Sequence, residues 1–372
     1  MGSRVFISDT HVSAGSGLKV SGKQHPWDWF TKNSKARLLH LLEWILWRTA
    51  HKQAGMWDKV DELVLVGDVF DNWVYPHDVK PPTFHEILTS DYASPVCDAL
   101  NAIASAAKVT FVPGNHDMTL TANTLKDAGL KIDYCPAPYV RGGVRAEHGN
   151  LHALFCAPDP EGRELPLGYF ISRIAATAKR DKKTTFLSVV GTVKRLLAIW
   201  KKDQPVVTGI FDEICCQAGL DGNDRIKMPD DLMNGAEPQI KSIRRLYKNI
   251  YDEFVAHDGP IDARWRLWGD AELLDLAACS QLLTHDEPVV IMGHTHKRKW
   301  FAANQMLFPD PHYVNTGAWI GPSNAAWAEV GKVRNGSVDV KAFRYKKNTH
   351  GLPMRHQRFP SVLHKLPFEG MI

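Results

Sequence analysis

The 372-residue sequence lacks a strong excess of charge of either sign. It holds 45 Lys and Arg against 41 Asp and Glu, so the net charge is +4 with histidine neutral. This excess is too small to indicate nucleic acid as a partner, although it does not exclude one. Long apolar runs are also missing, since none reaches the length of about 20 residues that a membrane-spanning helix needs. We therefore expect no transmembrane segment.

Cysteine is scarce, and its spacing is irregular. The six cysteines never occur as Cys-x-x-Cys, which argues against a disulfide framework and against a zinc site built on thiolates. The charged stretch and apolar stretch of a secretory signal do not precede the apolar residues 5–7. We expect a cytoplasmic protein, while peripheral membrane contact and the oligomeric state stay open.

Histidine stands out among the residues that are present. The chain has 17 histidines, whereas its 44% hydrophobic and 23% charged residues are ordinary for a globular protein and exclude collagen-like, disordered and coiled-coil chains. Neutral imidazole is the commonest metal ligand among side chains. The places of the histidines in the chain therefore decide whether they form a site.

Short apolar runs alternate with helical patterns in the first half of the chain. The runs at 4–7, 62–66 and 109–112 are continuous and rich in β-branched residues and leucine, as strands buried on both faces are. Between the first two runs, apolar residues within 35–49 recur at helical spacing. A similar run returns at 287–292. This alternation predicts an α/β fold.

The length suits one large core that carries an insertion. We predict a first part of the core at 1–157 and a second part at 285–345. The stretch between them, 158–284, has helical spacing and few strand patterns, which predicts a mainly helical insertion or cap. Residues 346–372 are basic and rich in His and Pro, which predicts a surface tail.

Polar clusters directly follow the predicted strands. In open α/β sheets, functional groups gather just beyond the carboxyl ends of the strands. The candidates at these places are Asp9, His11, Asp68, Asp71, Asn115, His116, His148, His294 and His296. A donor set of oxygen and nitrogen without sulfur suits Mn²⁺, Fe²⁺ or Zn²⁺, and it is large enough for two ions that share a carboxylate.

Five short motifs contain these residues. They are Asp9-x-His11, Gly67-Asp68-x-x-Asp71, Gly114-Asn115-His116-Asp117, His148-Gly149 and Gly293-His294-x-His296. In order and approximate spacing they resemble the motifs of the calcineurin-like metallophosphoesterases. The resemblance covers 1–155 and 285–342 and implies a four-layer α/β/β/α sandwich. Each motif alone has a plain alternative as a turn, because Asp, Gly and Asn favour turns, but five in this order make a chance match improbable.

The resemblance also implies which side chains hold metal. One divalent ion would be held by Asp9, His11 and His296. The other would be held by Asn115, His148 and His294. Asp68 would bridge the two ions, and a hydroxide between them would be the nucleophile. Mn²⁺ is the first choice for both, with Fe²⁺ or Zn²⁺ as alternatives.

A proton donor is implied as well. His116 would face the phosphate and protonate the leaving oxygen or stabilise the transition state, while Asp71 would orient its ring. A divalent ion can bring the pKa of bound water to about 7, so no further base is needed at neutral pH. His148 has a competitor in His152, because only a His-Gly pair marks the fourth motif.

The substrate is predicted from residues beside the motifs. Trp73 makes the second motif similar to that of the UDP-2,3-diacylglucosamine pyrophosphatases, a branch with a helical insertion over the site. That branch commonly has Arg where this chain has His116, so the specific activity is not carried over. Trp73 is a candidate for substrate contact. Lys297 and Arg298 directly follow the last motif and are candidates for phosphate binding.

The favoured activity is hydrolysis of a phosphodiester or pyrophosphate in a small nucleotide-linked or lipid-linked molecule. A phosphomonoesterase or phosphoprotein phosphatase is the first alternative, and a nuclease is the second. A catalytically inactive interaction scaffold of the same fold would be expected to have lost ligands. None of the motif residues is missing here, which favours an enzyme.

Overall fold

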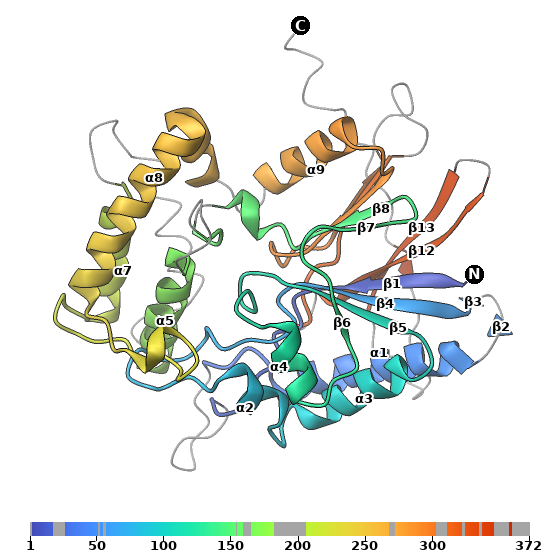
Figure 1. Ribbon diagram of the computed structural model, residues 1–372, viewed down its shortest axis with the longest axis horizontal. Helices are drawn as coiled ribbons and strands as arrows, with labels where there is room; N and C mark the ends of the chain where they lie inside the picture. Colours follow the sequence, from blue (N-terminus) through green and yellow to red (C-terminus); the bar gives the residue numbers. More distant parts are fainter. Residues whose placement is uncertain are drawn as a thin grey trace, which may run out of the picture.

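A computed structural model describes most of the chain. The residues described are 2–17, 27–50, 53–54, 57–153, 155–158, 165–181, 206–267, 272–302, 311–321, 324–334, 337–345 and 357–358. Two sheets lie face to face with helices outside them, and a separate group of helices lies beyond one end of the sheets (Figure 1).

The larger sheet has seven strands in the order β14-β13-β12-β1-β4-β5-β6. Their bounds are β1 Ser3–Ile7, β4 Val60–Val66, β5 Lys108–Val112, β6 Asp133–Tyr134, β12 Ala326–Arg334, β13 Ser337–Arg344 and β14 Gln357–Arg358. β1 pairs in parallel with β4, and β4 with β5. The carboxyl ends of these three strands therefore share one edge, and the loops that follow them start side by side.

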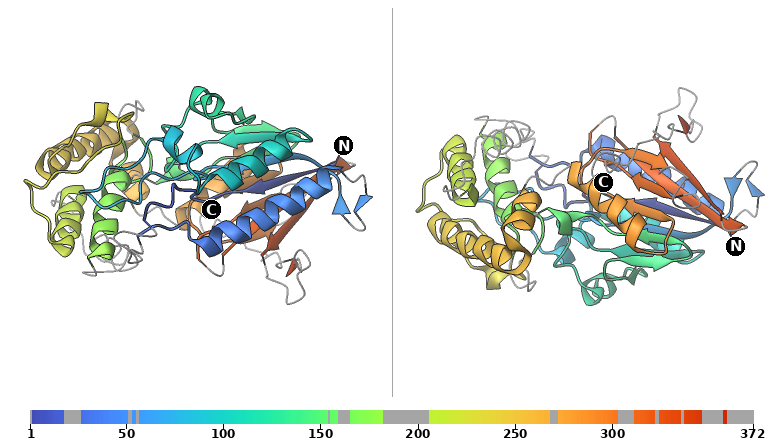
Figure 2. Two further views of the ribbon diagram at one scale, coloured as in Figure 1. Left: turned by 90° about the horizontal axis from the view of Figure 1, so that it is seen from below. Right: turned by 90° about the horizontal axis from the view of Figure 1, so that it is seen from above.

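One face of the larger sheet is covered by α1 (Lys32–Ala50) and α3 (Ser94–Ala104), as the view from below shows (Figure 2). α1 turns Leu38, Leu41 and Ile45 into the core between helix and sheet, which is the apolar stripe expected of a helix that covers a sheet. The shorter helices α2 (Phe84–Leu88) and α4 (Ala122–Asp127) lie in the connections after β4 and β5. A small ribbon, β2 (Gln53–Ala54) with β3 (Trp57–Asp58), follows α1.

The smaller sheet has five strands in the order β10-β11-β9-β8-β7. Their bounds are β7 Tyr139–Arg141, β8 Val144–Ala146, β9 Val289–Met292, β10 Lys299–Ala302 and β11 His312–Asn315. Its inner face packs on the larger sheet, where Phe6 and Val64 share a core with Ile291 and Val314. Both faces of the central strands are thus covered, which explains why their sequences are apolar without alternation.

Helix α9 (Glu272–Thr284) covers the outer face of the smaller sheet, as the view from above shows (Figure 2). Leu274, Ala278 and Leu282 pack there against strand residues of β9 to β11. The layers are therefore α1 and α3, the larger sheet, the smaller sheet and α9, which confirms the α/β/β/α sandwich. α9 lies within the stretch 158–284 that we predicted as an insertion, yet it packs on the sheet. The spacing of its apolar residues predicts a helix but does not show which surface that helix packs against.

The remaining helices form a group of their own. They are α5 (Leu167–Arg180), α7 (Val206–Ala218) and α8 (Ile240–Leu267), with the short turns η1 (Asn150–His152) and η2 (Met233–Gly235) nearby in sequence. Phe170, Ile210 and Ile243 belong to an apolar cluster that these three helices share. Trp73, from the loop after β4, belongs to the same cluster, so this group lies against the edge where the strands end (Figure 1).

Two sequence expectations concern segments outside these elements. The predicted tail at 346–372 lies outside the described residues except for 357–358. Among the helices in the described ranges, none is long and apolar enough to cross a bilayer.

Candidate metal centre

The loops after β1, β4, β5, β8 and β9 meet at one edge of the two sheets. Backbone hydrogen bonds hold them in register, from Asp9 N to the carbonyl of Gly67 (3.0 Å) and from His11 N to that of Asp68 (2.9 Å). A third joins the motifs on the smaller sheet, from Gly293 N to the carbonyl of His148 (3.0 Å). All nine candidate residues from the five motifs are therefore carried to one place by the fold.

The backbone is strained where these loops turn. Seven residues other than glycine have positive φ in the described part of the chain, and five of them are motif residues. Those five are Asp9, His11, Asp68, His294 and His296, with φ between 48° and 67°. Such conformations cost about 1 to 3 kcal/mol each and concentrate at functional sites. The turns aim side chains inward that a relaxed backbone would direct elsewhere.

Gly67 and Gly114 allow the loops to approach closely. Gly67 has a φ of 73°, and a Cβ there would lie 2.5 Å from the Cβ of His148. A Cβ on Gly114 would collide with the carboxylate of Asp68. These two motif glycines are thus required by contact between loops, beyond the freedom of the turn itself.

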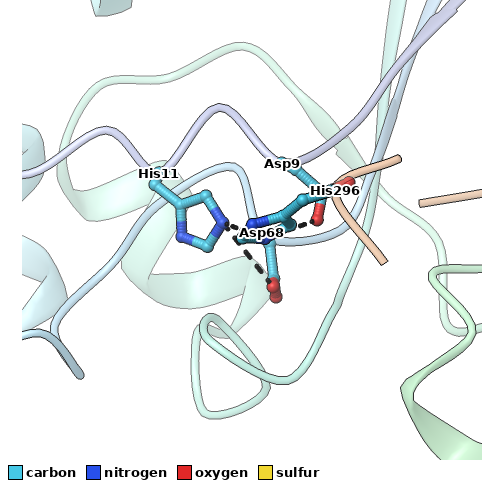
Figure 3. Close-up of side chains that lie close together, drawn as sticks. All are labelled: Asp9, His11, Asp68 and His296. Atoms are coloured by element: carbon cyan, nitrogen blue, oxygen red, sulfur yellow. Dashed lines mark hydrogen bonds and ion pairs between the residues drawn. The ribbon is translucent and has the colours of Figure 1, made fainter. Parts of the chain in front are cut away.

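A first group of side chains consists of Asp9, His11, Asp68 and His296, whose ligand atoms converge (Figure 3). His11 Nε2 lies 3.1 Å from His296 Nε2, and His296 Nε2 lies 3.3 Å from Asp9 Oδ1. Two ligand atoms about 2.1 Å from one ion and at right angles to each other lie about 3 Å apart. The spacing in this group is that of ligands around a single ion.

A second group consists of Asp68, His148 and His294, with Asn115 beside them. His148 Nε2 lies 3.0 Å from Asp68 Oδ2, and His294 Nδ1 lies 3.1 Å from Asn115 Oδ1. Asp68 belongs to both groups, since its Oδ2 is also 4.0 Å from His11 Nε2. The two groups bring together residues that the resemblance implied for each ion, and their roles as metal ligands stay predictions.

Asp71 lies between two histidines. Its Oδ2 is 2.9 Å from His11 Nδ1, and its Oδ1 is 3.1 Å from His116 Nδ1. A carboxylate that accepts from Nδ1 leaves Nε2 of His11 to face the first group, which is how a protein orients a metal-binding imidazole. From the sequence we predicted that Asp71 orients His116, and the structure adds His11 to its contacts.

The sequence pattern that defines the calcineurin-like phosphoesterase family matches residues 3–298, which is most of the chain. The chain belongs to this family. It is therefore a metal-dependent hydrolase of phosphoric esters. A search among curated proteins gave no match.

His148 shows that this phosphoesterase site fits a cation. Its Nδ1 donates to the carbonyl of Val66 (3.0 Å), so the buried Nε2 faces the carboxylate of Asp68, with Oδ2 at 3.0 Å. Burial lowers the pKa of His148, but the carboxylates of Asp68 and Asp9 outweigh burial and raise it to about 10. The surrounding carboxylates thus strongly favour a positive charge beside His148 Nε2. A divalent ion bound between this nitrogen and the Asp68 carboxylate would supply that charge.

His294 provides a neutral donor to the same site. Burial and the nearby His148 lower the pKa of His294 to about 3, so its ring carries no proton charge at neutral pH. A neutral imidazole is the form that binds metal. Together with the oxygen donors and the absence of sulfur from both groups, this fits divalent ions of the Mn²⁺, Fe²⁺ and Zn²⁺ kind.

His116 belongs to neither of the two groups above, but its ring nitrogen converges with His11 and Asp71 in a third. Its backbone N–H donates to Asp68 Oδ1 (2.8 Å), and its Nε2 lies 4.0 Å from Asp68 Oδ2. Burial lowers the pKa of His116, but Asp71 and Asp68 outweigh it and raise the pKa to about 8. The ring is held with one nitrogen toward Asp71 and the other toward the two groups.

Asp117 has a role that the sequence did not assign. Its carboxylate accepts backbone hydrogen bonds from four residues, Asp68, Val69, Phe70 and Gly114, at 2.6 to 3.3 Å. It thereby fixes the second motif loop against the third. Its place at the end of Gly114-Asn115-His116-Asp117 was the available signal, because a fully buried carboxylate after a turn needs such donors.

Two tryptophans flank His116 in different ways. Trp73 stacks on its ring with 4.4 Å between centroids and is only 2% exposed. We predicted Trp73 as a substrate contact, but its burial between His116 and Tyr169 leaves almost no free surface, so it supports the imidazole instead. Trp29 is half-buried and lies 5.0 to 5.7 Å from the rings of three site histidines, His11, His116 and His296. Its position depends on long-range packing that no motif signals.

The remaining candidates are His152, Lys297 and Arg298. His152 pairs with Glu147, with 2.7 Å between Nε2 and Oε1, which gives it a partner away from both groups. Lys297 is exposed and Arg298 half-buried on the loop that leads from His296 to β10. No contact in the described structure places the charged end of Lys297 at the site, and the phosphate role of both residues stays a prediction.

Proposed function

We propose that this phosphoesterase hydrolyses a phosphodiester or pyrophosphate bond of a small molecule and uses two divalent ions to do so. The supporting observation is the shared carboxylate of Asp68, which belongs to both groups of converging ligand atoms. Two hydrolytic ions that share one ligand sit about 3.5 to 4 Å apart, which suits an in-line displacement at phosphorus.

Seven side chains are proposed as metal ligands. Asp9, His11 and His296 would hold one ion. Asn115, His148 and His294 would hold the other, and Asp68 would bridge. When bound, the ions supply Lewis acidity to the phosphate oxygens and lower the pKa of water. We assign Mn²⁺ first because oxygen and imidazole donors dominate, with Fe²⁺ or Zn²⁺ as alternatives.

His116 is the proposed proton donor to the leaving oxygen. Its Nε2 faces the two groups, while its Nδ1 faces Asp71 at 3.1 Å. The carboxylate of Asp71 beside Nδ1 stabilises the doubly protonated ring, whose Nε2 proton is the one available for donation. In this proposal the ring is not a metal ligand, which leaves its Nε2 available to the leaving oxygen.

The substrate class rests on residues around the ions. The second motif, with Trp73, is similar to that of the UDP-2,3-diacylglucosamine pyrophosphatases, although His116 stands where that branch commonly has Arg and Trp73 itself is buried. The half-buried Trp29 forms an aromatic border beside three site histidines, which suits an organic group attached to the phosphate. Lys297 and Arg298 are proposed to contact the phosphate itself. The net charge of +4 does not favour nucleic acid, and a cytoplasmic location stays a prediction.

The test compares bis-p-nitrophenyl phosphate with p-nitrophenyl phosphate, using the chain loaded with Mn²⁺. We expect a higher kcat/KM for the diester, and a reversed preference would indicate a phosphomonoesterase. In His116→Ala, we expect kcat on diphenyl phosphate, whose phenolate leaving group needs a proton, to fall about 100-fold or more. His152→Ala is the matched control, because His152 pairs with Glu147 outside both groups. Full activity in His116→Ala would remove the acid role, and no activity with any ester would favour an inactive scaffold.

A further inference from the structure

We propose that Arg173 of helix α5 is a positioning residue for His116, and that it acts through Tyr169 and Trp73. The helical group would then belong to the catalytic apparatus as a support for the proton donor. This rests on the proposed role of His116 as that donor. The contacts that carry it run through the buried interior, from α5 to the loop after β4.

Trp73 is the residue that touches His116. Its ring stacks on the imidazole with 28° between the planes, and its backbone N–H donates to Asp71 Oδ1 (2.7 Å). One residue thus supports the face of the imidazole and also orients the carboxylate beside its Nδ1. A displacement of Trp73 would move both supports of His116 together.

Tyr169 holds Trp73 from the other side. Its ring meets Trp73 edge-on with 5.5 Å between centroids, a favourable aromatic arrangement. The side chain is fully buried, and its hydroxyl accepts a hydrogen bond from Arg173 Nη1 (3.0 Å). The orientation of the Tyr169 ring therefore depends on Arg173.

Arg173 binds the same loop directly. It is fully buried, and its Nε donates to the carbonyl of Tyr75 (2.7 Å), while Nη2 donates to those of Pro76 (2.9 Å) and Val79 (2.6 Å). Nη1 also donates to the carbonyl of Lys227 (2.6 Å). The loop that carries Trp73 is thus fixed within a few residues of the tryptophan.

These bonds use the shape of the guanidinium. Its donors lie in a rigid planar fork and reach carbonyls from two separate segments, which the three donors of a lysine ammonium cannot all reproduce. Burial of a charge is costly unless hydrogen bonds satisfy it, and Arg173 satisfies its donors on backbone that leads to the site. The arrangement fixes the geometry of that loop.

A misplaced proton donor leaves a specific kinetic signature. When the ester bond breaks, the leaving oxygen takes up the bonding electron pair and needs a proton if its conjugate acid is weak. p-Nitrophenolate leaves readily without one, whereas phenolate, the anion of a much weaker acid, depends on it. Loss of positioning therefore reduces kcat more for the phenyl ester than for the nitrophenyl ester, with KM little changed.

The experiment measures kcat and KM of the Mn²⁺-loaded full chain on bis-p-nitrophenyl phosphate and diphenyl phosphate. For Arg173→Lys we expect the ratio of the two kcat values to shift against diphenyl phosphate by roughly 10-fold, a part of the 10² to 10⁴ that a general acid contributes. Arg48→Lys is the matched control, because Arg48 is equally buried but binds Glu329 and the carbonyl of Asp58 at the other end of β1. Its ratio should stay at the wild-type value.

Trp73 keeps the test decisive if Arg173→Lys does not fold. We expect Trp73→Leu to shift the ratio as Arg173→Lys does, and Trp73→Phe, which keeps a stacking ring, to stay near wild type. If the ratio shifts in His116→Ala but stays unchanged in Arg173→Lys or Trp73→Leu, the positioning role of Arg173 is wrong and the proposed role of His116 stands. An unchanged ratio in His116→Ala would instead overturn the proposed role of His116.

Discussion

Strand β1 has buried charge at both of its ends, but the protein treats the two ends differently. At the amino end, Arg48 is fully buried and donates to both carboxylate oxygens of Glu329, at 2.7 and 3.1 Å. It also donates to Ser3 Oγ and to the carbonyl of Asp58. Positive and negative charge cancel there within the chain, and the contacts join α1 to the sheet.

At the carboxyl end, the charges do not cancel in this way. Asp9, Asp68 and Asp71 are all buried beside histidines, and within the described residues their ion pairs are with these histidines and not with Arg or Lys. The backbone is strained at Asp9 and His11, with φ of 53° and 48°. The charges at the amino end of β1 thus stabilise the fold, whereas those at its carboxyl end favour binding of a cation. Substitutions at the amino end should lower stability, and substitutions at the carboxyl end should lower activity.

Asp68→Asn should have the largest effect. The substitution keeps the size of the side chain but removes the charge shared by both ligand groups. We expect kcat/KM on bis-p-nitrophenyl phosphate to fall about 10³-fold or more, since metal ions supply several kcal/mol of transition-state stabilisation. A loss of less than 10-fold would contradict the shared role.

Arg48→Met tests the opposite end. It leaves Glu329 buried and unpaired, which should lower the free energy of unfolding by about 3 to 5 kcal/mol, measured with urea. The kcat/KM of the metal-loaded protein should stay within about 3-fold of wild type. Replacing Glu329 by Leu as well should recover most of the stability, because an apolar pair needs no charge compensation. A loss of activity that persists in the double variant would break the separation of the two ends.

Asp28 is a buried carboxylate near the carboxyl end that the chain satisfies itself, with Ser13 Oγ and the N–H of Phe30 as donors. Burial raises its pKa from the usual 3.8 to about 6, helped by the nearby Asp71 and opposed by Lys179. The folded state therefore binds this proton more tightly than the unfolded state, so stability should fall by about 3 kcal/mol as the pH rises from about 4 to about 6.

Asp28→Asn has no such proton to lose. We expect the unfolding free energy of the wild type, measured with urea between pH 4 and pH 7, to fall relative to that of the variant as the pH rises. Parallel curves would show that Asp28 titrates at the usual value for an aspartate.

Asp71→Asn should have the smallest effect of the four. An amide has only one acceptor oxygen and no charge, so it cannot hold both His11 and His116 as the carboxylate does, and both rings lose orientation. We expect metal affinity and kcat/KM each to fall about 10-fold to 100-fold, the usual cost of losing a partner of a metal-bound histidine. Calorimetry with Mn²⁺ measures the metal affinity. If kcat falls while the metal affinity stays unchanged, Asp71 positions His116 and does not support the proposed metal ligand His11.

Much of the sheet core could be predicted from the sequence. The runs at 4–7, 62–66 and 109–112 lie within β1, β4 and β5, because continuous apolar residues reflect strands covered on both faces. The residues that follow these runs meet because parallel strands end at a common edge. The layered fold is confirmed, whereas the roles of the metal ligands stay predictions that the geometry supports.

Other features depend on contacts between distant segments and could not be predicted. Arg173 reads as one basic residue of a helix until the carbonyls of Tyr75 and Lys227 surround it. Trp29 follows a loop whose packing against the site histidines has no local pattern. α9 has the same spacing as the helices before it and differs only in the surface that it covers. Local sequence patterns carry periodicity and turns, but not these partners.

The most direct test of the two-ion centre is the metal content of the purified full chain after saturation with Mn²⁺ and removal of the free ions. We expect two ions per wild-type chain, and at most one in Asp68→Asn. A wild-type chain that holds only one ion at saturation, or none, would contradict the assignment of the two groups to two ions that share Asp68.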